Sequence, residues 1–159
     1  MASYQVLDIQ LALHYFSDEE NMQMMIKMFA MDCFSQRLQD YHRDLIAMDF
    51  KKLKVRDDDL RGVFNFLTSP EMISLISVDM RNAIYAGDEE KLILLHLIFL
   101  RKCSILHREL EDYLQAPVPS PDIKEYVNEC LKKLNKEDKV QEIEGEARGS
   151  VFCAGCSIF

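Results

Sequence analysis

The sequence contains no tryptophan, and residues that interrupt helices are scarce, with five glycines and four prolines among 159 residues. Basic residues are also in the minority, because 19 Lys and Arg stand against 27 Asp and Glu and give a formal net charge of -8. No basic tract offsets this charge, which argues against a nucleic-acid-binding surface. A glycine-rich phosphate loop and a His-Glu-x-x-His motif are absent as well. The sequence therefore lacks the usual signatures of nucleotide binding and of zinc-dependent catalysis.

Signals for secretion and for membrane spanning are missing too. The first ten residues carry no basic or apolar signal region, and the five cysteines are an odd number, so we expect a reduced, cytosolic protein. The longest apolar run, residues 92–100, is about half of what a membrane helix needs. The four histidines are scattered and the two cysteines nearest the end have no second pair of ligands, so we expect no metal and no cofactor. His42 and His107 are predicted to be surface imidazoles, and His96 to flank the core.

Helical periodicity is the dominant pattern in the sequence. Its residues are 48% hydrophobic, too many for a disordered chain, and they recur at intervals of three and four without the alternation typical of strands. The nine methionines, several of them between Met22 and Met31, are expected mainly to fill core space. The predicted helices are a short one over about 5–15, four long ones over 17–48, 50–67, 69–87 and 88–113, and another over 120–135.

The ends of these helices carry capping signals. Residues 17–20, Ser-Asp-Glu-Glu, fit a capping box, and Ser69-Pro70 is a cap followed by proline in the first turn. Gly87 is predicted to end one helix and Asp88 to cap the next.

The short connections force neighbouring helices to run antiparallel. We therefore expect an all-α, up-down four-helix bundle with a short N-terminal helix over residues 1–116. A Pro-rich hinge and an accessory helix are expected over 117–135, and a flexible tail over 136–159.

One face of the second long helix is the candidate site. At 100° per residue, Asp58 points away from the inward-facing Leu60 and Leu67. A mid-helix glycine costs about 1 kcal/mol relative to alanine, so a glycine on this exposed face suggests close approach of another molecule. The alternative is an ordinary solvated face with ion pairs worth about 0.2–0.5 kcal/mol each. The residues predicted to bind a partner are Lys51, Lys54, Asp58, Arg61, Gly62 and Asn65.

The spacing of these residues resembles a histidine-containing phosphotransfer (HPt) domain, the helical relay protein of two-component phosphorelays. The core pattern of that family is His-x-Leu-Lys-Gly nine residues after an Asp, and this chain has Asp49 followed by 58–62, Asp-Asp-Leu-Arg-Gly. The family often continues with Leu-Glu-x-Ala before Gly-Asp, where this chain has Met-Arg-Asn-Ala at 80–83 before Gly-Asp at 87–88. The resemblance covers about residues 5–115 and implies a helical bundle.

Asp58 occupies the position of the phosphorylatable histidine in that family. There the imidazole accepts a phosphoryl group from a receiver-domain aspartate, the Lys three residues on helps to neutralise it, and the Gly leaves room for docking. The resemblance implies that Arg61 and Gly62 keep the last two roles, whereas Asp58 cannot form a phosphohistidine. Asp57 is a second departure, since the family usually has a small apolar residue there. The chain therefore resembles a pseudo-HPt protein without relay chemistry.

The last seven residues, Cys-Ala-Gly-Cys-Ser-Ile-Phe, fit a C-a-a-X prenylation box at Cys156, and the final Phe favours geranylgeranyl over farnesyl. One lipid gives only reversible membrane binding, so a second signal is expected. A polybasic patch is absent, because residues 136–149 hold three basic and five acidic residues, and Cys153 is the expected palmitoylation site. We expect a lipid-anchored protein on the cytoplasmic face of a membrane in a eukaryotic cell, and a cytoplasmic protein otherwise.

These observations favour a signalling adaptor that is not an enzyme and that binds a protein partner, such as a receiver-like domain, through the face around Asp58. The carboxylate would place a permanent negative charge where a phosphohistidine would form. Two alternatives are a negative regulator that occupies receiver domains and a membrane-tethered scaffold unrelated to phosphorelays. Basic residues clustered with Gly62 would favour the adaptor or the regulator, and an exposed apolar patch on the Met-rich helix would favour the scaffold.

Overall fold

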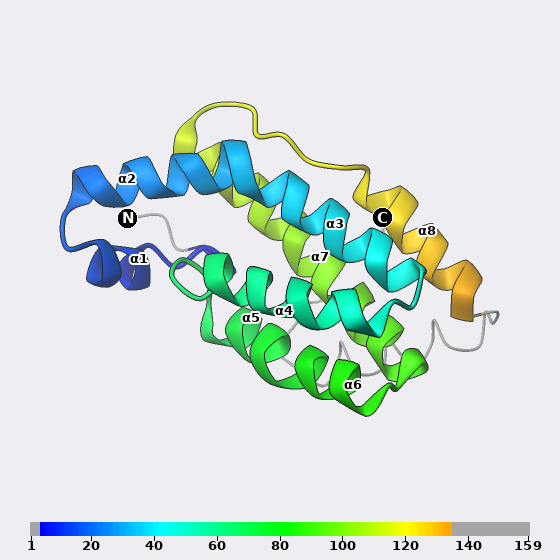
Figure 1. Ribbon diagram of the computed structural model, residues 1–159. Helices are drawn as coiled ribbons and strands as arrows, with labels where there is room; N and C mark the ends of the chain where they lie inside the picture. Colours follow the sequence, from blue (N-terminus) through cyan, green and yellow to red (C-terminus); the bar gives the residue numbers. More distant parts are fainter. Residues whose placement is uncertain (1–3, 135–159) are drawn as a thin grey trace.

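The computed structural model describes residues 4–134, and these are helical apart from the segments that connect the helices (Figure 1). The predicted helical class is confirmed for this part of the chain. Within it, β pairing is limited to an isolated antiparallel bridge between Leu7 and Thr68. The elements in chain order are α1 (Ile9–Phe16), α2 (Glu19–Met28), η1 (Phe29–Cys33), α3 (Phe34–Ile46), α4 (Phe50–Phe64), α5 (Pro70–Ser74), η2 (Leu75–Met80), α6 (Arg81–Ala86), α7 (Glu89–Leu114) and α8 (Ile123–Leu134).

The predicted tail, with Cys153 and Cys156, lies outside the described residues. Among the helices that are described, none combines the length and the apolar character required to cross a bilayer.

Two of the long helices contain a wider, π-helical turn. Helices α2 and α3 are joined through η1, and α5 and α6 are joined through η2, without a break in the helical backbone. Such turns insert one residue into the helical repeat and shift the face that follows. The sequence pattern predicts each of these segments as one regular helix, and it contains no signal for the π turns.

The start of α2 differs from the prediction by one residue. The carboxylate of Asp18 caps the helix by accepting a hydrogen bond from the Asn21 N–H at 2.8 Å. Ser17 instead ends α1 in the left-handed conformation (φ 68°), and its own N–H donates to the Leu13 carbonyl. Since Ser17 is needed to end one helix, it cannot cap the next, and the predicted capping box over 17–20 is wrong.

The first predicted helix also begins later, at Ile9, because Asp8 is its N-cap. The backbone N–H groups of residues 5–7 do not enter a helix and donate to the carboxylate of Glu109 on α7, with distances of 2.9 Å from Val6 and 2.8 Å from Leu7. The extended segment is held on its other side by backbone hydrogen bonds to residues 67 and 69. It is therefore fastened between α7 and the connection from α4 to α5.

The other predicted caps are confirmed. The Ser69 hydroxyl accepts from the Met72 N–H, with Pro70 in the first turn. Gly87 ends α6 in the left-handed region (φ 66°), and Asp88 caps α7 by accepting from the Lys91 N–H at 3.0 Å.

The helices enclose a single hydrophobic core. Helix α3 packs on α4, α4 packs on η2 and α6, and these pack on α7. Helix α8 contacts both α7 and α3 and lies along the seam between them (Figure 1). The predicted inward stripes are buried, and aromatic rings such as Phe64 contact both Phe29 and Phe99, with ring centroids 5.3 and 5.8 Å apart. The core therefore fixes which side of α4 faces outward.

Candidate functional site

The residues predicted to bind a partner lie along the outward side of α4. The helix is capped by Asp49, and its inward positions, among them Leu53 and Leu60, are buried. We call the resulting surface the α4 face: Lys51, Lys54, Asp58 and Gly62 are exposed, Arg61 and Asn65 are half-buried, and Arg81 and Tyr85 join them from α6.

Two neighbouring carboxylates on α4 have opposite environments. The side chain of Asp58 is 62% exposed, whereas that of Asp57 is 1% exposed. Among the described residues, Asp57 Oδ1 has no hydrogen-bond partner. Arg61 contacts both carboxylates, and Arg81 Nη1 lies 3.2 Å from Asp57 Oδ2 and 3.4 Å from Asp58 Oδ1. Burial raises the pKa of Asp57, and the hydrogen bond from Arg61 lowers the pKa of Asp58. The exposed carboxylate is therefore held ionised between two guanidinium groups.

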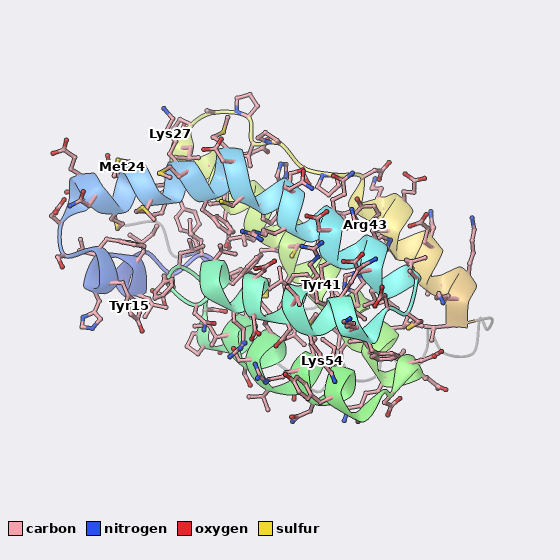
Figure 2. The ribbon with its side chains drawn as sticks, in the orientation of Figure 1. Tyr15, Met24, Lys27, Tyr41, Arg43 and Lys54 are labelled. Carbon is pink, nitrogen blue, oxygen red and sulfur yellow. The ribbon has the colours of Figure 1, made fainter. Side chains whose placement is uncertain are left out.

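The cations around Asp58 are only in part those expected. The ion pair between Asp58 and Arg61 was expected from their spacing on α4. The second cation that pairs with Asp58 is Arg81 of α6, which no helical spacing relates to Asp58. Lys54, which is labelled in Figure 2, lies over the exposed ring of Tyr85, with Nζ 4.7 Å from the ring centroid. Arg81 lies 5.2 Å from the same ring. Lys54 therefore contributes a positive charge beside an aromatic ring.

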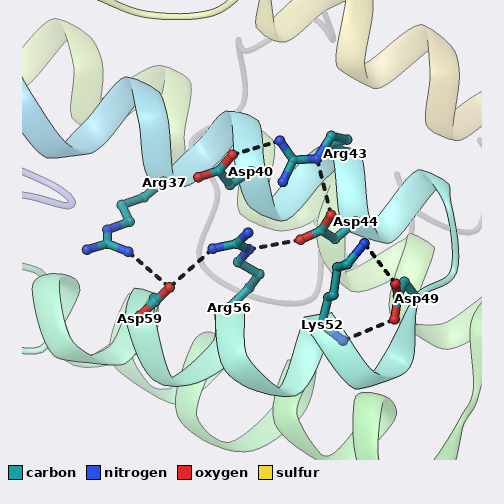
Figure 3. Close-up of polar contacts among 8 residues, drawn as sticks. All are labelled: Arg37, Asp40, Arg43, Asp44, Asp49, Lys52, Arg56 and Asp59. Carbon is teal, nitrogen blue, oxygen red and sulfur yellow. Dashed lines mark hydrogen bonds and ion pairs between the residues drawn. The ribbon is translucent and has the colours of Figure 1, made fainter.

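The far side of α4 is fixed to α3 by a chain of ion pairs (Figure 3). Arg56 Nε donates to Asp44 at 2.8 Å, and Asp59 pairs with Arg37 at 2.9 Å and with Arg56 at 3.5 Å. Asp44 is buried, which would raise its pKa, but hydrogen bonds from Arg56 and Arg43 lower it. These bonds restrict rotation of α4 and keep the α4 face outward.

Gly62 is in ordinary helical backbone on the α4 face, and a Cβ added there would meet no atom of residues 4–134 within 4 Å, its own helix backbone aside. Nothing inside the described structure requires a glycine, so we expect Gly62→Ala to raise the free energy of unfolding by about 0.5–1 kcal/mol. Gly87→Ala is the matched control and is expected to lower it, because Gly87 has a positive φ. Urea denaturation of the two variants measures both changes. A loss of stability in Gly62→Ala would mean that the glycine has a structural role.

The predicted exposure of His42 is wrong. His42 is buried, and its ring is stacked on Tyr126 of α8 with centroids 3.8 Å apart. The charged neighbours Arg43 and Asp44 led to the prediction that His42 is on the surface. The sequence pattern gave no indication that α8 packs over this position. His107 is also half-buried, with Nε2 donating to the Val118 carbonyl at 2.7 Å.

The sequence reasoning missed the polar cluster to which His42 belongs. His42 lies against His96 of α7 and against Glu129 and Cys130 of α8. The signal that was available is the spacing of Tyr126, Glu129 and Cys130, which share one face of α8 at intervals of three and four.

The expectation that the clustered methionines fill the core is mostly wrong. Of the five between positions 22 and 31, Met22 is buried and Met25 is half-buried, whereas Met24, Met28 and Met31 are exposed. The last three recur at intervals of four and three on the outward side of α2 and η1, where Figure 2 labels Met24. The core positions of α2 are taken by Met22 and Ile26.

Comparison with family models, with curated proteins and with solved structures finds no match to this chain. The chemistry of the α4 face is therefore interpreted from its own geometry. An ionised carboxylate held by two guanidinium groups, beside an exposed aromatic ring and an uncovered stretch of backbone, is suited to recognising a protein surface of complementary charge.

Proposed function

We propose that this chain is a non-catalytic signalling adaptor that binds a protein partner through the α4 face. The observation that carries the proposal is an exposed mid-helix glycine next to an ionised carboxylate. No contact within residues 4–134 accounts for Gly62, whereas a partner that approaches the backbone would. Arg61 and Arg81 hold Asp58 in one position, so a partner meets a pre-organised charge.

The order of the long helical segments supports an HPt-like, up-down four-helix bundle. In this interpretation the four helices are α2–α3, α4, α5–α6 and α7, and neighbouring segments in this order pack against each other. The family's phosphohistidine position would then be mid-way along α4, where Asp58 is exposed. The partner class that this arrangement favours is a receiver-like domain.

Asp58 would act in this adaptor as a partial mimic of a phosphohistidine. A carboxylate carries less charge and fewer acceptor oxygens than a phosphoryl group. The mimic would therefore bind a receiver without turnover. A receiver that is occupied in this way could not take part in a phosphorelay. Binding through the α4 face would therefore also account for the alternative function, that of a negative regulator.

The proposal is tested by titrating the protein with purified receiver domains from its source organism. We expect Asp58→Ala to weaken binding by about 10- to 150-fold, since a hydrogen bond to a charged group is worth about 1.5–3 kcal/mol. Asp32→Ala removes an exposed carboxylate of η1 and is the matched control. Equal dissociation constants for the wild type and Asp58→Ala would overturn the mimicry.

A scaffold unrelated to phosphorelays is the second candidate, and the stripe of Met24, Met28 and Met31 favours it. Exposed methionines are flexible and polarizable and recur at promiscuous binding surfaces. Lipid anchoring through Cys156, with Cys153 as a second site, stays a prediction for either candidate, and intact-mass analysis with a Cys156→Ser control tests it.

A further inference from the structure

Three buried side chains from three different helices meet beneath α8. His42 comes from α3, His96 from α7 and Cys130 from α8. One ligand atom from each of the three residues lies within 4.8 Å of the other two, and His42 Nδ1 is 2.9 Å from His96 Nε2. These helices are separated by tens of residues in the chain, so the cluster is a product of the fold.

The hydrogen bonds around His42 determine which nitrogen atoms carry protons. The Glu129 carboxylate can only accept, so His42 Nε2 donates to it across 2.6 Å and Nδ1 is left with a lone pair. That lone pair faces His96 Nε2 at 2.9 Å, which must then donate. His96 Nδ1 is buried and has no hydrogen-bond partner in the part of the chain that the structure describes. A carboxylate that fixes the tautomer of a histidine, with the other nitrogen aimed into a ligand cluster, is the usual second shell of a metal site.

We propose that His42 Nδ1, His96 Nε2 and Cys130 Sγ form a binding site for a transition-metal ion of the zinc class, with Glu129 as the positioning residue. Two imidazoles and one thiolate are donors that suit Zn²⁺. Tetrahedral Zn²⁺ places its nitrogen ligands about 3.4 Å apart, so the cluster requires shifts of about 0.5 Å between the two imidazole nitrogens. Three protein ligands leave the fourth position to water.

Metal binding at this cluster displaces one proton and involves no redox step. The Cys130 S–H bond breaks, the sulfur–metal bond forms, and the thiol proton passes to solvent. Burial raises the pKa of Cys130 to about 12, so the free thiol is protonated at neutral pH and becomes a thiolate only when the ion binds. The proton on His96 Nε2 moves to the unpartnered Nδ1, which frees Nε2 for the ion. Burial lowers the pKa of both imidazoles, so neither carries a second proton to be displaced.

An ion at this position would fasten α8 to the rest of the fold. Cys130 belongs to α8, whereas His42 and His96 belong to the two helices on which α8 packs. The inference does not depend on the α4 face or on its partner.

The test uses the metal-stripped full chain titrated with Co²⁺, which replaces Zn²⁺ and reports a bound thiolate by a charge-transfer absorption band. We expect one equivalent to bind and the band to be lost in Cys130→Ala. Cys103→Ala removes an equally buried thiol of α7 outside the cluster and is expected to keep the band. The double variant Cys153→Ser/Cys156→Ser is also expected to keep the band, which shows that Co²⁺ is not bound by the two cysteines near the end of the sequence. Absence of the band in the wild type, its persistence in Cys130→Ala or its loss in the double variant would overturn the proposal.

Glu129→Gln provides a second test that does not alter a buried side chain, since the carboxylate side chain is 42% exposed. We expect it to weaken Zn²⁺ binding about 10–100-fold, the usual cost of losing a second-shell partner. Zn²⁺ at a hundredfold excess over its dissociation constant is expected to raise the Tm of the wild type by roughly 5–10 °C. An unchanged Tm in the wild type would leave the cluster as a buried hydrogen-bond chain without a metal. Unchanged Zn²⁺ affinity in Glu129→Gln would overturn the assignment of Glu129 as the positioning residue.

Discussion

Replacing Asp58 by histidine is expected to give a protein that accepts a phosphoryl group from a receiver domain. On the HPt-like interpretation, Asp58→His restores the imidazole at the position that meets a receiver aspartate. The side chain at this position is exposed, so the imidazole would be accessible. Arg61 and Arg81, which hold Asp58 in the wild type, would neutralise the phosphoryl group.

The measurement for Asp58→His is incubation with a receiver domain phosphorylated by a small phosphodonor, in the Mg²⁺ that the receiver requires. The P–O bond of the aspartyl phosphate breaks, a P–N bond forms, and intact mass reports the acid-labile gain. Asp58→Asn is the control that removes the charge without supplying a nucleophile. A folded Asp58→His protein that gains no phosphoryl group from receivers that bind it would contradict the HPt-like placement of α4.

Glu109→Ala is expected to cause the largest loss of stability, about 2–4 kcal/mol. The carboxylate accepts from three successive backbone N–H groups, those of residues 5–7, and a hydrogen bond to a charged group is worth about 1.5–3 kcal/mol. The three bonds are not additive, but their loss leaves buried Val6 and Leu7 without backbone partners on this side. At roughly 2–4 °C per kcal/mol for a chain of this length, the Tm is expected to fall by about 4–16 °C.

Thermal denaturation of Glu109→Ala and Arg108→Ala measures this effect against an exposed neighbour on the same helix. Arg108→Ala is expected to change the free energy of unfolding by less than about 0.5 kcal/mol. Faster hydrogen exchange at the Val6 and Leu7 amides would locate the loss in the N-terminal segment. A Glu109→Ala protein as stable as the wild type would show that the hydrogen bonds to Glu109 are not what holds the segment in place.

The helical class and most helix ends could be predicted from the sequence because they depend on local signals. Apolar spacing indicated the inward sides, and short-range caps such as Asp88 and Ser69 act within three residues of their partners. The Ser17 error has the same origin, since two adjacent residues offer cap oxygens and only the ending of α1 decides between them.

The parts of the candidate sites that could not be predicted are those that depend on contacts between distant residues. Asp58 and Arg61 share one helix and could be paired from their spacing, whereas Arg81 reaches them from α6. His42 is buried because α8 packs over it, and this burial makes it a candidate metal ligand. No local pattern around residue 42 indicates the contact with α8. The outward position of Met24 depends likewise on which side of α2 meets the core.

The measurement that tests the central claim most directly is a map of amide chemical-shift changes in the isotope-labelled protein when a receiver domain is added. The adaptor account predicts that the largest changes fall on residues 51–65 of α4 and on Arg81 and Tyr85 of α6. Changes confined to Met24 and its neighbours on α2 and η1 would assign binding to the methionine stripe and contradict the α4 face. No changes at saturating receiver would remove receiver domains as its partner.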